Sequence, residues 1–219
     1  ILRNEPYNVG SENAIAIGNG SKITAANGAI AIGNNTNITA VSSGTGNGAV
    51  NAVAIGVNAT VERQTCIALG NGSEASRENT VAIGTNVNAT RENSVVIGQN
   101  ATATQERVVA IGAYATVNGD RTVAIGPEAT ANGSKSIVIG GIGDPNAKAI
   151  AEKDQAIVIG NGAQATDNAA YSVTLGNNAK TAGATGISIG DRAQVVASAA
   201  NGIALGQSAV ANNSGDIAI

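Results

Sequence analysis

The 219-residue sequence contains no Phe, Met, Trp or His, and it has only three Tyr, three Pro and one Cys. Without His, and with a single Cys, the chain lacks the usual ligands of protein zinc sites. Charge is also scarce, because 12% of residues are charged and the net charge is −3. A charge so weak and scattered does not favour nucleic-acid binding. No run of about eighteen apolar residues predicts a membrane-spanning helix, and no basic start followed by an apolar segment predicts a signal peptide.

The single cysteine, Cys66, has no partner in the chain for an internal disulfide. Its position in an apolar repeat favours a small buried residue in a strand. Near-total avoidance of cysteine is compatible with a protein that leaves the cell.

What the sequence does contain is a repeat. NTVAIG at 79–84 returns fourteen residues later as NSVVIG at 93–98, and the general unit is small, Ile/Val, small, Ile/Leu, Gly. Seven of the twelve spacings between successive repeat glycines are fourteen residues. A further copy at 216–219 stops where its glycine is due, so we expect the chain to be a fragment that ends inside a repeat. The repeat glycines are Gly18, Gly33, Gly56, Gly70, Gly84, Gly98, Gly112, Gly126, Gly140, Gly160, Gly176, Gly190 and Gly206.

The second half of each repeat carries small or apolar residues three and five positions after the glycine, which is the alternation of a strand. Asn-Gly pairs such as Asn118-Gly119 and Asn132-Gly133 lie between the halves and favour turns. Each repeat therefore predicts one coil of a parallel β-solenoid, with two strands of about five residues. Coils stacked ~4.8 Å apart would form a rod on the order of 60–70 Å long. The glycine after the first strand predicts a corner with unusual backbone angles.

Both faces of the first strand are apolar. Val81 and Ile83 point together and Ala82 points away, because side chains alternate along a strand. We expect the Val/Ile pair to fill the interior and the middle residue to face outward, where a long apolar column indicates an association surface. A homo-oligomer of parallel, in-register chains is the preferred interpretation, and a bare, slightly apolar face is the alternative. The expected interface residues are Ala54, Ala68, Ala82, Val96, Ala110, Ala124, Val138 and Val158.

Charged residues concentrate in the predicted turns. One repeat position holds Arg63, Arg77 and Arg91, and the next holds Glu78, Glu92 and Glu106. Neighbouring columns of opposite charge are compatible either with a solvated turn ladder that contributes little per pair, or with salt bridges between chains.

Two repeats are longer than the rest and predict loops near 41–49 and 141–155. Loops on a rigid scaffold often carry recognition, although tolerated insertions explain them equally well. The candidate partner-binding residues in these loops are Ser42, Ser43, Thr45, Asn47, Asp144, Pro145, Asn146 and Lys148.

No catalytic, cofactor-binding or metal-binding residues are predicted. Hexapeptide acyltransferase solenoids need a His, which is absent, and no nucleophile has a base partner in a repeated arrangement. An ice-binding solenoid would present a flat Thr array. Thr60, Thr102, Thr116 and Thr130 share a column, but Glu74 and Asn88 interrupt it.

The repeated motifs resemble the YadA-like head of trimeric autotransporter adhesins, which are surface proteins of Gram-negative bacteria. The motifs are ENTVAIG (78–84), ENSVVIG (92–98), DRTVAIG (120–126) and SKSIVIG (134–140). The resemblance covers residues 11–219, with residues 1–10 as a lead-in segment. It implies an all-β fold, a left-handed parallel β-roll of 14-residue coils that assembles as a C3 homotrimer.

The resemblance also implies a function, namely multivalent adhesion to host matrix proteins, host receptors or other bacteria. It places the chain outside the cell, attached to the outer membrane only through a C-terminal anchor that this sequence does not include. In some relatives a repeat of the Asn-Ser-Val-Ala-Ile-Gly-x-x-Ser type is tied to collagen binding. The nearest stretch here, at 93–101, has Val96 for Ala and Ala101 for Ser. A purely structural spacer in a surface fibre is the alternative function.

Overall fold

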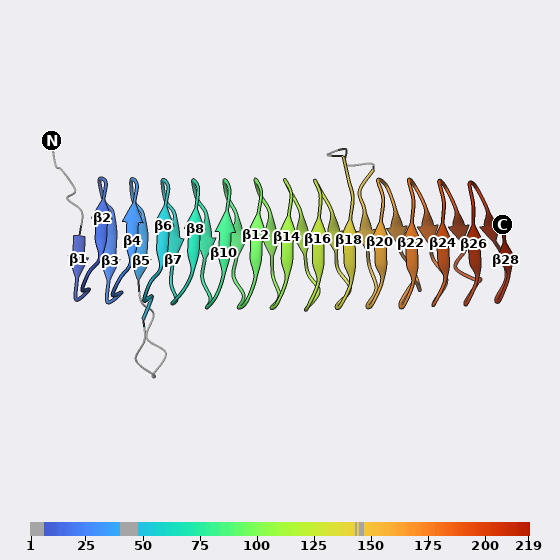
Figure 1. Cartoon of the computed structure of the whole chain (residues 1–219), viewed down its shortest axis with the longest axis horizontal. Coiled ribbons are helices and arrows are strands. Elements are labelled where there is room, and N and C mark those ends of the chain that lie inside the picture. Colours follow the sequence, from blue (N-terminus) through green and yellow to red (C-terminus); the bar gives the residue numbers. More distant parts are fainter. Residues whose placement is uncertain (1–6, 40–47, 143, 145–146) are drawn as a thin grey trace. The chain divides into compact units, whose positions relative to one another are not determined.

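The computed structural model describes residues 7–39, 48–142, 144 and 147–219. All secondary-structure elements assigned within these residues are β-strands. The chain divides into two compact units, Ile1–Arg107 and Val108–Ile219, which are described separately. In each unit the chain winds through alternating strands of two parallel sheets, so each unit is a parallel β-solenoid (Figure 1).

The first unit contributes even-numbered strands to a first sheet and odd-numbered strands to a second sheet. The first sheet contains β2 (Ile15–Ile17), β4 (Ile30–Ile32), β6 (Val53–Ile55), β8 (Ile67–Leu69), β10 (Val81–Ile83) and β12 (Val95–Ile97). The second sheet contains β1 (Tyr7–Val9), β3 (Lys22–Thr24), β5 (Asn37–Thr39), β7 (Thr60–Val61), β9 (Glu74–Ala75), β11 (Asn88–Ala89) and β13 (Thr102–Ala103).

The second unit repeats the same arrangement. Its first sheet contains β14 (Val109–Ile111), β16 (Val123–Ile125), β18 (Ile137–Ile139), β20 (Ile157–Ile159), β22 (Val173–Leu175), β24 (Ile187–Ile189), β26 (Ile203–Leu205) and β28 (Ile217–Ala218). Its second sheet contains β15 (Thr116–Val117), β17 (Thr130–Ala131), β19 (Ile150–Ala151), β21 (Gln164–Ala165), β23 (Lys180–Thr181), β25 (Gln194–Val195) and β27 (Val210–Ala211).

Pairing in both sheets is parallel and joins equivalent positions of successive repeats. Ala82 of β10 pairs with Val96 of β12, and Thr116 of β15 pairs with Thr130 of β17. The prediction of a parallel β-solenoid in which one repeat forms one coil is therefore confirmed. The strands are shorter than the predicted five residues, because the chain turns corners on both sides of each three-residue or two-residue strand. The second sheet begins at β1, inside the segment expected to be a lead-in.

The repeat glycine marks the corner after each first-sheet strand. Gly70 has φ +130°, and a Cβ atom there would overlap the carbonyl group of Gly84 in the next coil. Gly126 has φ +128° and lies in the same way against Gly140. The expected corner glycine is thus confirmed, and it is required by close backbone stacking as well as by φ.

Asparagine occupies the left-handed position of many turns, where its short polar side chain tolerates positive φ better than most residues do. Asn79 and Asn93 both have φ 56°. Asn79 Nδ2 also donates to Asn93 Oδ1 at 3.3 Å, so equivalent turns of successive coils are linked. The Asn that opens each NTVAIG-type motif is therefore explained by turn geometry.

The interior of a coil is a narrow row of small side chains. In the coil around Gly84, the inward residues are Thr80, Ala82, Val87 and Ala89, and each is at most 1% exposed. Two of them precede the corner and two follow it, so both sheets contribute equally. The two sheets lie close enough that a single valine with three small residues fills the layer.

Hydroxyl groups link the interior of one coil to a turn of the next. Thr80 Oγ1 donates to the Arg91 carbonyl at 2.9 Å, and Ser136 Oγ donates to the Lys153 carbonyl at 3.0 Å. At Thr80, Ser94, Thr122 and Ser136 the hydroxyl before the apolar triplet thereby satisfies a turn carbonyl without reaching solvent, as buried polar groups require.

Cys66 occupies this same repeat position. Its side chain is fully buried, and its thiol donates to the Arg77 carbonyl in the next coil. Burial raises the pKa of the Cys66 thiol, because the thiolate would lose hydration. The folded chain therefore keeps this proton at a pH where an unfolded thiol loses it, so this residue's contribution to stability falls as pH rises above about 8.5.

We predict that Cys66 in the folded protein does not react with Ellman's reagent at pH 8, and that it reacts fully in guanidinium chloride. The Cys66→Ser variant should retain the fold, since Ser occupies this position in other coils. Between pH 8 and pH 10 the wild type should lose more stability than this variant does. Rapid labelling of the native thiol would contradict the buried assignment.

Substituting a corner glycine tests the close stacking. We expect Gly70→Ala to lower the free energy of unfolding by about 3 kcal/mol or more, because the added Cβ overlaps the next coil's backbone. Gly215→Ala is the matched control, since Gly215 has φ +77° but no atom lies within 4 Å of a Cβ there. The control should cost only the ~1–2 kcal/mol of a left-handed conformation. Equal losses, measured by chemical unfolding, would show that stacking is not the constraint.

Candidate functional site

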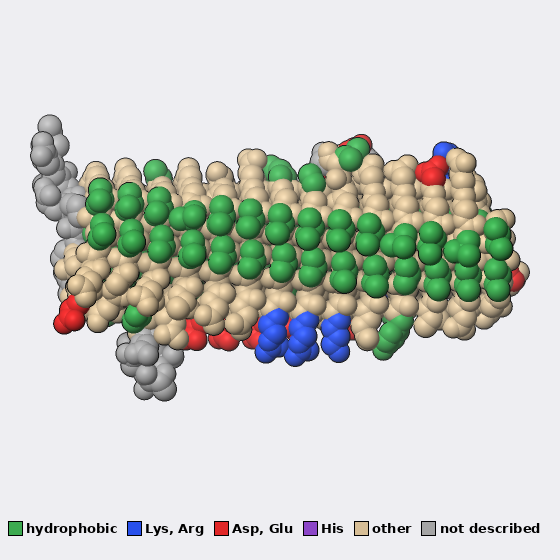
Figure 2. Space-filling view, viewed as in Figure 1, with side chains coloured by type: hydrophobic (Ala, Val, Ile, Leu, Met, Phe, Trp, Pro, Cys, Tyr) green, Lys and Arg blue, Asp and Glu red, His purple; other side chains and the backbone are tan. Residues whose placement is uncertain are grey.

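The outward side of the first sheet is a continuous apolar surface within each unit. Both outward positions of each three-residue strand of this sheet, and the outward position of the two-residue β28, are Val, Ile or Leu, as the two rows of hydrophobic side chains over each unit in Figure 2 show. We call these residues the apolar face. In the first unit they are Ile15, Ile17, Ile30, Ile32, Val53, Ile55, Ile67, Leu69, Val81, Ile83, Val95 and Ile97. In the second unit they are Val109, Ile111, Val123, Ile125, Ile137, Ile139, Ile157, Ile159, Val173, Leu175, Ile187, Ile189, Ile203, Leu205 and Ile217.

The apolar face is substantially accessible in the single chain. Ile137 and Ile139 are 39% and 38% exposed, and the next coil's Ile157 and Ile159 are 37% and 40% exposed. Full burial of such a side chain contributes ~1.5–3 kcal/mol, so covering two half-buried residues per coil would contribute about 1–2 kcal/mol per coil. Repeated over successive coils, this surface is large enough to indicate an association site.

The expected orientation of the first strand was wrong. Ala54, Ala68, Ala82, Val96, Ala110, Ala124, Val138 and Val158, which we expected at an interface, are all 0% exposed within their own chain. They point into the solenoid, and the Val/Ile pair that we expected inside points outward. The narrow gap between the sheets explains the reversal, because an inward pair of large residues from every first-sheet strand would not fit. An apolar association surface does exist, but different residues form it.

The corrected orientation predicts that one leucine substitution destabilises the chain and that another leaves its stability nearly unchanged. Ala82→Leu adds three carbons to a filled interior and should lower stability by ~1–3 kcal/mol. Asn88→Leu, at an exposed outward position of the second sheet, should change stability by less than about 0.5 kcal/mol. Thermal unfolding of both variants provides the measurement. An Ala82→Leu variant as stable as the wild type would instead support the orientation expected from the sequence, with Ala82 facing outward.

The candidate binding loops are only partly described. Ser42, Ser43, Thr45, Asn47, Pro145 and Asn146 lie outside the described residues. Lys148 Nζ forms an ion pair with Glu128 Oε2 at 3.2 Å, and Gly162 N donates to the Ala147 carbonyl at 3.0 Å. Lys148 and the Ala147 carbonyl together therefore hold this segment against the coils on either side, and Asp144 contributes its carbonyl to the Ala147 amide at 2.9 Å.

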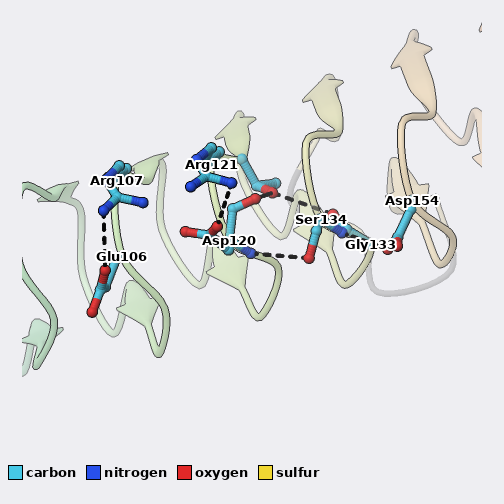
Figure 3. A network of polar contacts seen from close by, with 8 residues as sticks. Glu106, Arg107, Asp120, Arg121, Gly133, Ser134 and Asp154 are labelled. Atoms are coloured by element: carbon cyan, nitrogen blue, oxygen red, sulfur yellow. Dashed lines mark hydrogen bonds and ion pairs between the residues drawn. The ribbon is translucent and has the colours of Figure 1, made fainter.

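The turns that enter the first sheet carry short polar contacts. In the second unit, Arg121 pairs with Asp120 at 3.2 Å, and Asp154 Oδ1 accepts a hydrogen bond from the Ser134 amide at 2.8 Å (Figure 3). In the first unit, Arg107 pairs with its neighbour Glu106 at 3.6 Å. These pairs are exposed, so each contributes little to stability.

Two arginines of the predicted Arg column make hydrogen bonds within their own chain. Arg77 donates to the Ser76 carbonyl at 3.1 Å, and Arg91 donates through Nε to the Thr104 carbonyl at 3.2 Å. The guanidinium groups therefore contact backbone carbonyls of their own chain. The hypothesis of salt bridges between chains remains a prediction.

No group of three or more His, Cys, Asp or Glu side chains in the described residues is placed to bind a metal ion. The same part of the chain contains no helix long and apolar enough to cross a membrane.

Comparison with known proteins adds one strong match. A family model described as "YadA head domain repeat (2 copies)" matches residues 48–63, 67–86, 89–115, 118–141 and 151–179, which together make up more than half of the chain. No curated protein matches the sequence. Among solved structures, the collagen-binding domain of the Yersinia adhesin YadA is similar at 24% identity with a TM-score of 0.37. That match covers 70% of this chain and 65% of the solved chain, which is less than two thirds of its length.

Proposed function

The chain belongs to the YadA head domain repeat family, and on this basis we propose that it is the head region of a bacterial surface adhesin. The observation that carries the proposal is the family match over repeats that each form one coil. In this role the solenoid is a scaffold that holds weak contact sites at regular intervals, so that many contacts together give strong attachment. No catalytic step is proposed. The head would lie outside the cell, attached to the outer membrane.

We further propose that the apolar face associates with the same face of other copies in a C3 homotrimer of left-handed rolls. The supporting physical argument is that Val, Ile and Leu occupy both outward positions of successive strands with no charged residue among them. Parallel, in-register chains would bring equivalent coils together and remove both rows from water. The trimer is chosen over other oligomers because the family resemblance implies it.

In this chain, most residues of the stretch that resembles the collagen-associated motif have structural roles. Within 93–101, Ser94, Val96 and Ala101 are all 0% exposed, and Val95 and Ile97 belong to the apolar face. Asn93 and Gln99 are the exposed residues of this stretch. Contact with collagen or another matrix protein would therefore be made by side chains outside the apolar triplet. The loops near 41–49 and 141–155 stay proposed partner-binding segments, with Asp144 and Lys148 as described members.

The trimer is tested by the solution mass. We expect light scattering to give three chain masses for the wild type. Ile83→Lys should reduce the mass to that of one chain, because a buried, unpaired charge is strongly unfavourable. Asn88→Lys carries the same new charge on the second sheet and should leave the mass unchanged. A folded wild-type monomer, or a trimer that tolerates Ile83→Lys, would contradict the proposed interface.

Adhesion is tested by surface binding. We expect the purified chain to bind immobilised collagen, fibronectin or bacterial cells, and to bind more strongly as a trimer than as the Ile83→Lys variant. Grafting loop 41–49 or loop 141–155 onto an unrelated roll tests where binding lies. Transferred binding supports a recognition loop. If the trimer binds none of these surfaces, the head is a structural spacer and the adhesin proposal fails.

A further inference from the structure

Turn residues with positive φ lie along both edges of the apolar face in the second unit. We call the turns that precede first-sheet strands the entry edge, and the corners that follow those strands the exit edge. Tyr114 and Glu128 lie on the exit edge after β14 and β16, and Arg121 and Lys135 lie on the entry edge before β16 and β18. These four are the edge residues, and their φ angles lie between 55° and 59°.

Local geometry does not explain the edge residues. A positive φ favours Gly and Asn over large side chains. In the first unit, four successive positions of this kind hold Asn79, Asn86, Asn93 and Asn100, with φ between 53° and 56°. The four successive positions from 114 to 135 instead hold Tyr, Arg, Glu and Lys. Because the turn itself prefers Asn, these side chains indicate a contact made beyond the turn.

Beyond Lys135 the series of positive-φ turn residues is mixed. It includes Gly162, Tyr171, Asn178, Arg192 and Asn201. The stretch from Tyr114 to Lys135 is therefore an uninterrupted run of large side chains within the unit, on alternating edges of the apolar face.

The edge residues differ in how much of their surface is accessible. Tyr114 is 52% exposed, and the Arg121 side chain is 53% exposed although it pairs with Asp120 at 3.2 Å (Figure 3). Lys135 is exposed as well. Glu128 pairs with Lys148 at 3.2 Å, and its side chain is only 14% exposed. Tyr114 and Arg121 thus offer a large accessible aromatic ring on one edge and an accessible guanidinium on the other.

The chemistry of the two edges is complementary. The entry edge carries the cations Arg121 and Lys135, and basic side chains gather beside the apolar rows in Figure 2. The exit edge carries the Tyr114 ring, whose electron-rich face attracts a guanidinium. In a ring of parallel copies every contact is heterologous, so the exit edge of one copy meets the entry edge of the next. The trimer would therefore bring the cations of one copy to the aromatic ring of another.

We propose that Tyr114 of one copy packs on the guanidinium of Arg121 of the next copy. This inference rests on the proposed trimer and adds a contact at the rim of its apolar face. Because β14 pairs with β16, these two residues of parallel, in-register copies lie within about one strand spacing, ~4.8 Å, along the stack. The contact recurs three times in a C3 ring. The apolar rows repeat from coil to coil, whereas the edge residues do not, so the contact also favours one alignment of the copies.

Cross-linking between copies tests the proposed contact. In a Cys66→Ser background, Tyr114→Cys with Arg121→Cys places one thiol on each edge of every chain. At low protein concentration, we expect a short bismaleimide to join these chains into covalent dimers and trimers on a denaturing gel. The matched control, Tyr114→Cys with Asn178→Cys, places both thiols on the exit edge and should give single chains. Cross-links in the control, or none in a test pair that is trimeric by light scattering, overturn the inference.

A double-mutant cycle measures the strength of the same contact. Tyr114 and Arg121 lie on opposite edges of one chain, so coupling between them reports a contact between copies. Asn suits a positive φ, so Tyr114→Asn and Arg121→Asn should fold as well as the wild type does. We expect each to lower the trimer association constant about tenfold, and the double variant to lose little more than either. Arg192→Asn, which replaces an exposed arginine paired with Asp191, is the control and should combine additively with Tyr114→Asn.

The outcomes separate this contact from the trimer itself. Circular dichroism establishes that each variant is folded, and light scattering gives its mass. Additive losses from Tyr114→Asn and Arg121→Asn in a chain whose wild type is trimeric overturn this inference alone. A folded wild-type monomer overturns the proposed trimer, and the contact with it.

Discussion

The distance between the two sheets governs most of this structure. In the coil around Gly84 the first-sheet and second-sheet strands lie so close together that Thr80, Ala82, Val87 and Ala89 fill the space between them. The corner glycines allow this, because backbone stacks directly on backbone at residues such as Gly70 and Gly126. Ala82 and Ala89 are then both buried in the interior, and Thr80 can reach a turn carbonyl of the next coil. A larger interior would leave cavities that these side chains could not fill.

The narrow interior also determines what the chain presents to its surroundings. Most interior positions hold Ala, Ser, Thr or a single Val, so Val81 and Ile83 and their equivalents lie on the outer side of the first sheet. This arrangement reverses the usual relation between size and burial, in which the largest apolar side chains form the core. The chain therefore has a small core of its own and an apolar face suited to further copies. Folding and association are linked through the same Val-Ala-Ile triplet.

The remaining surface is divided by the same geometry. Charged residues concentrate in the turns, where solvent is accessible and backbone carbonyls are available to Arg77 and Arg91. The outer side of the second sheet holds mainly uncharged polar residues at the spacing of the coils. A solenoid of this kind offers few concave sites, so recognition depends on repetition along a surface. The polar residues on the outer side of the second sheet and the loops are therefore the parts of the chain available for contacts with other molecules.

The sequence alone determined the period, the parallel in-register pairing, the turn positions and the corner glycines, because each depends on spacing and local backbone preference. Asn79 and Gly84 illustrate this, since their roles follow from positive φ. The orientation of the first strand could not be obtained in the same way. Val81-Ala82-Ile83 has two apolar sides, and strand alternation separates the sides without saying which one is interior. The contact of Lys148 with Glu128 likewise joins residues twenty positions apart that only the stacking of coils brings together. Tertiary structure decided both features. The gap between the sheets admits alanine and excludes the Val/Ile pair, and the stacking of coils brings Lys148 to Glu128.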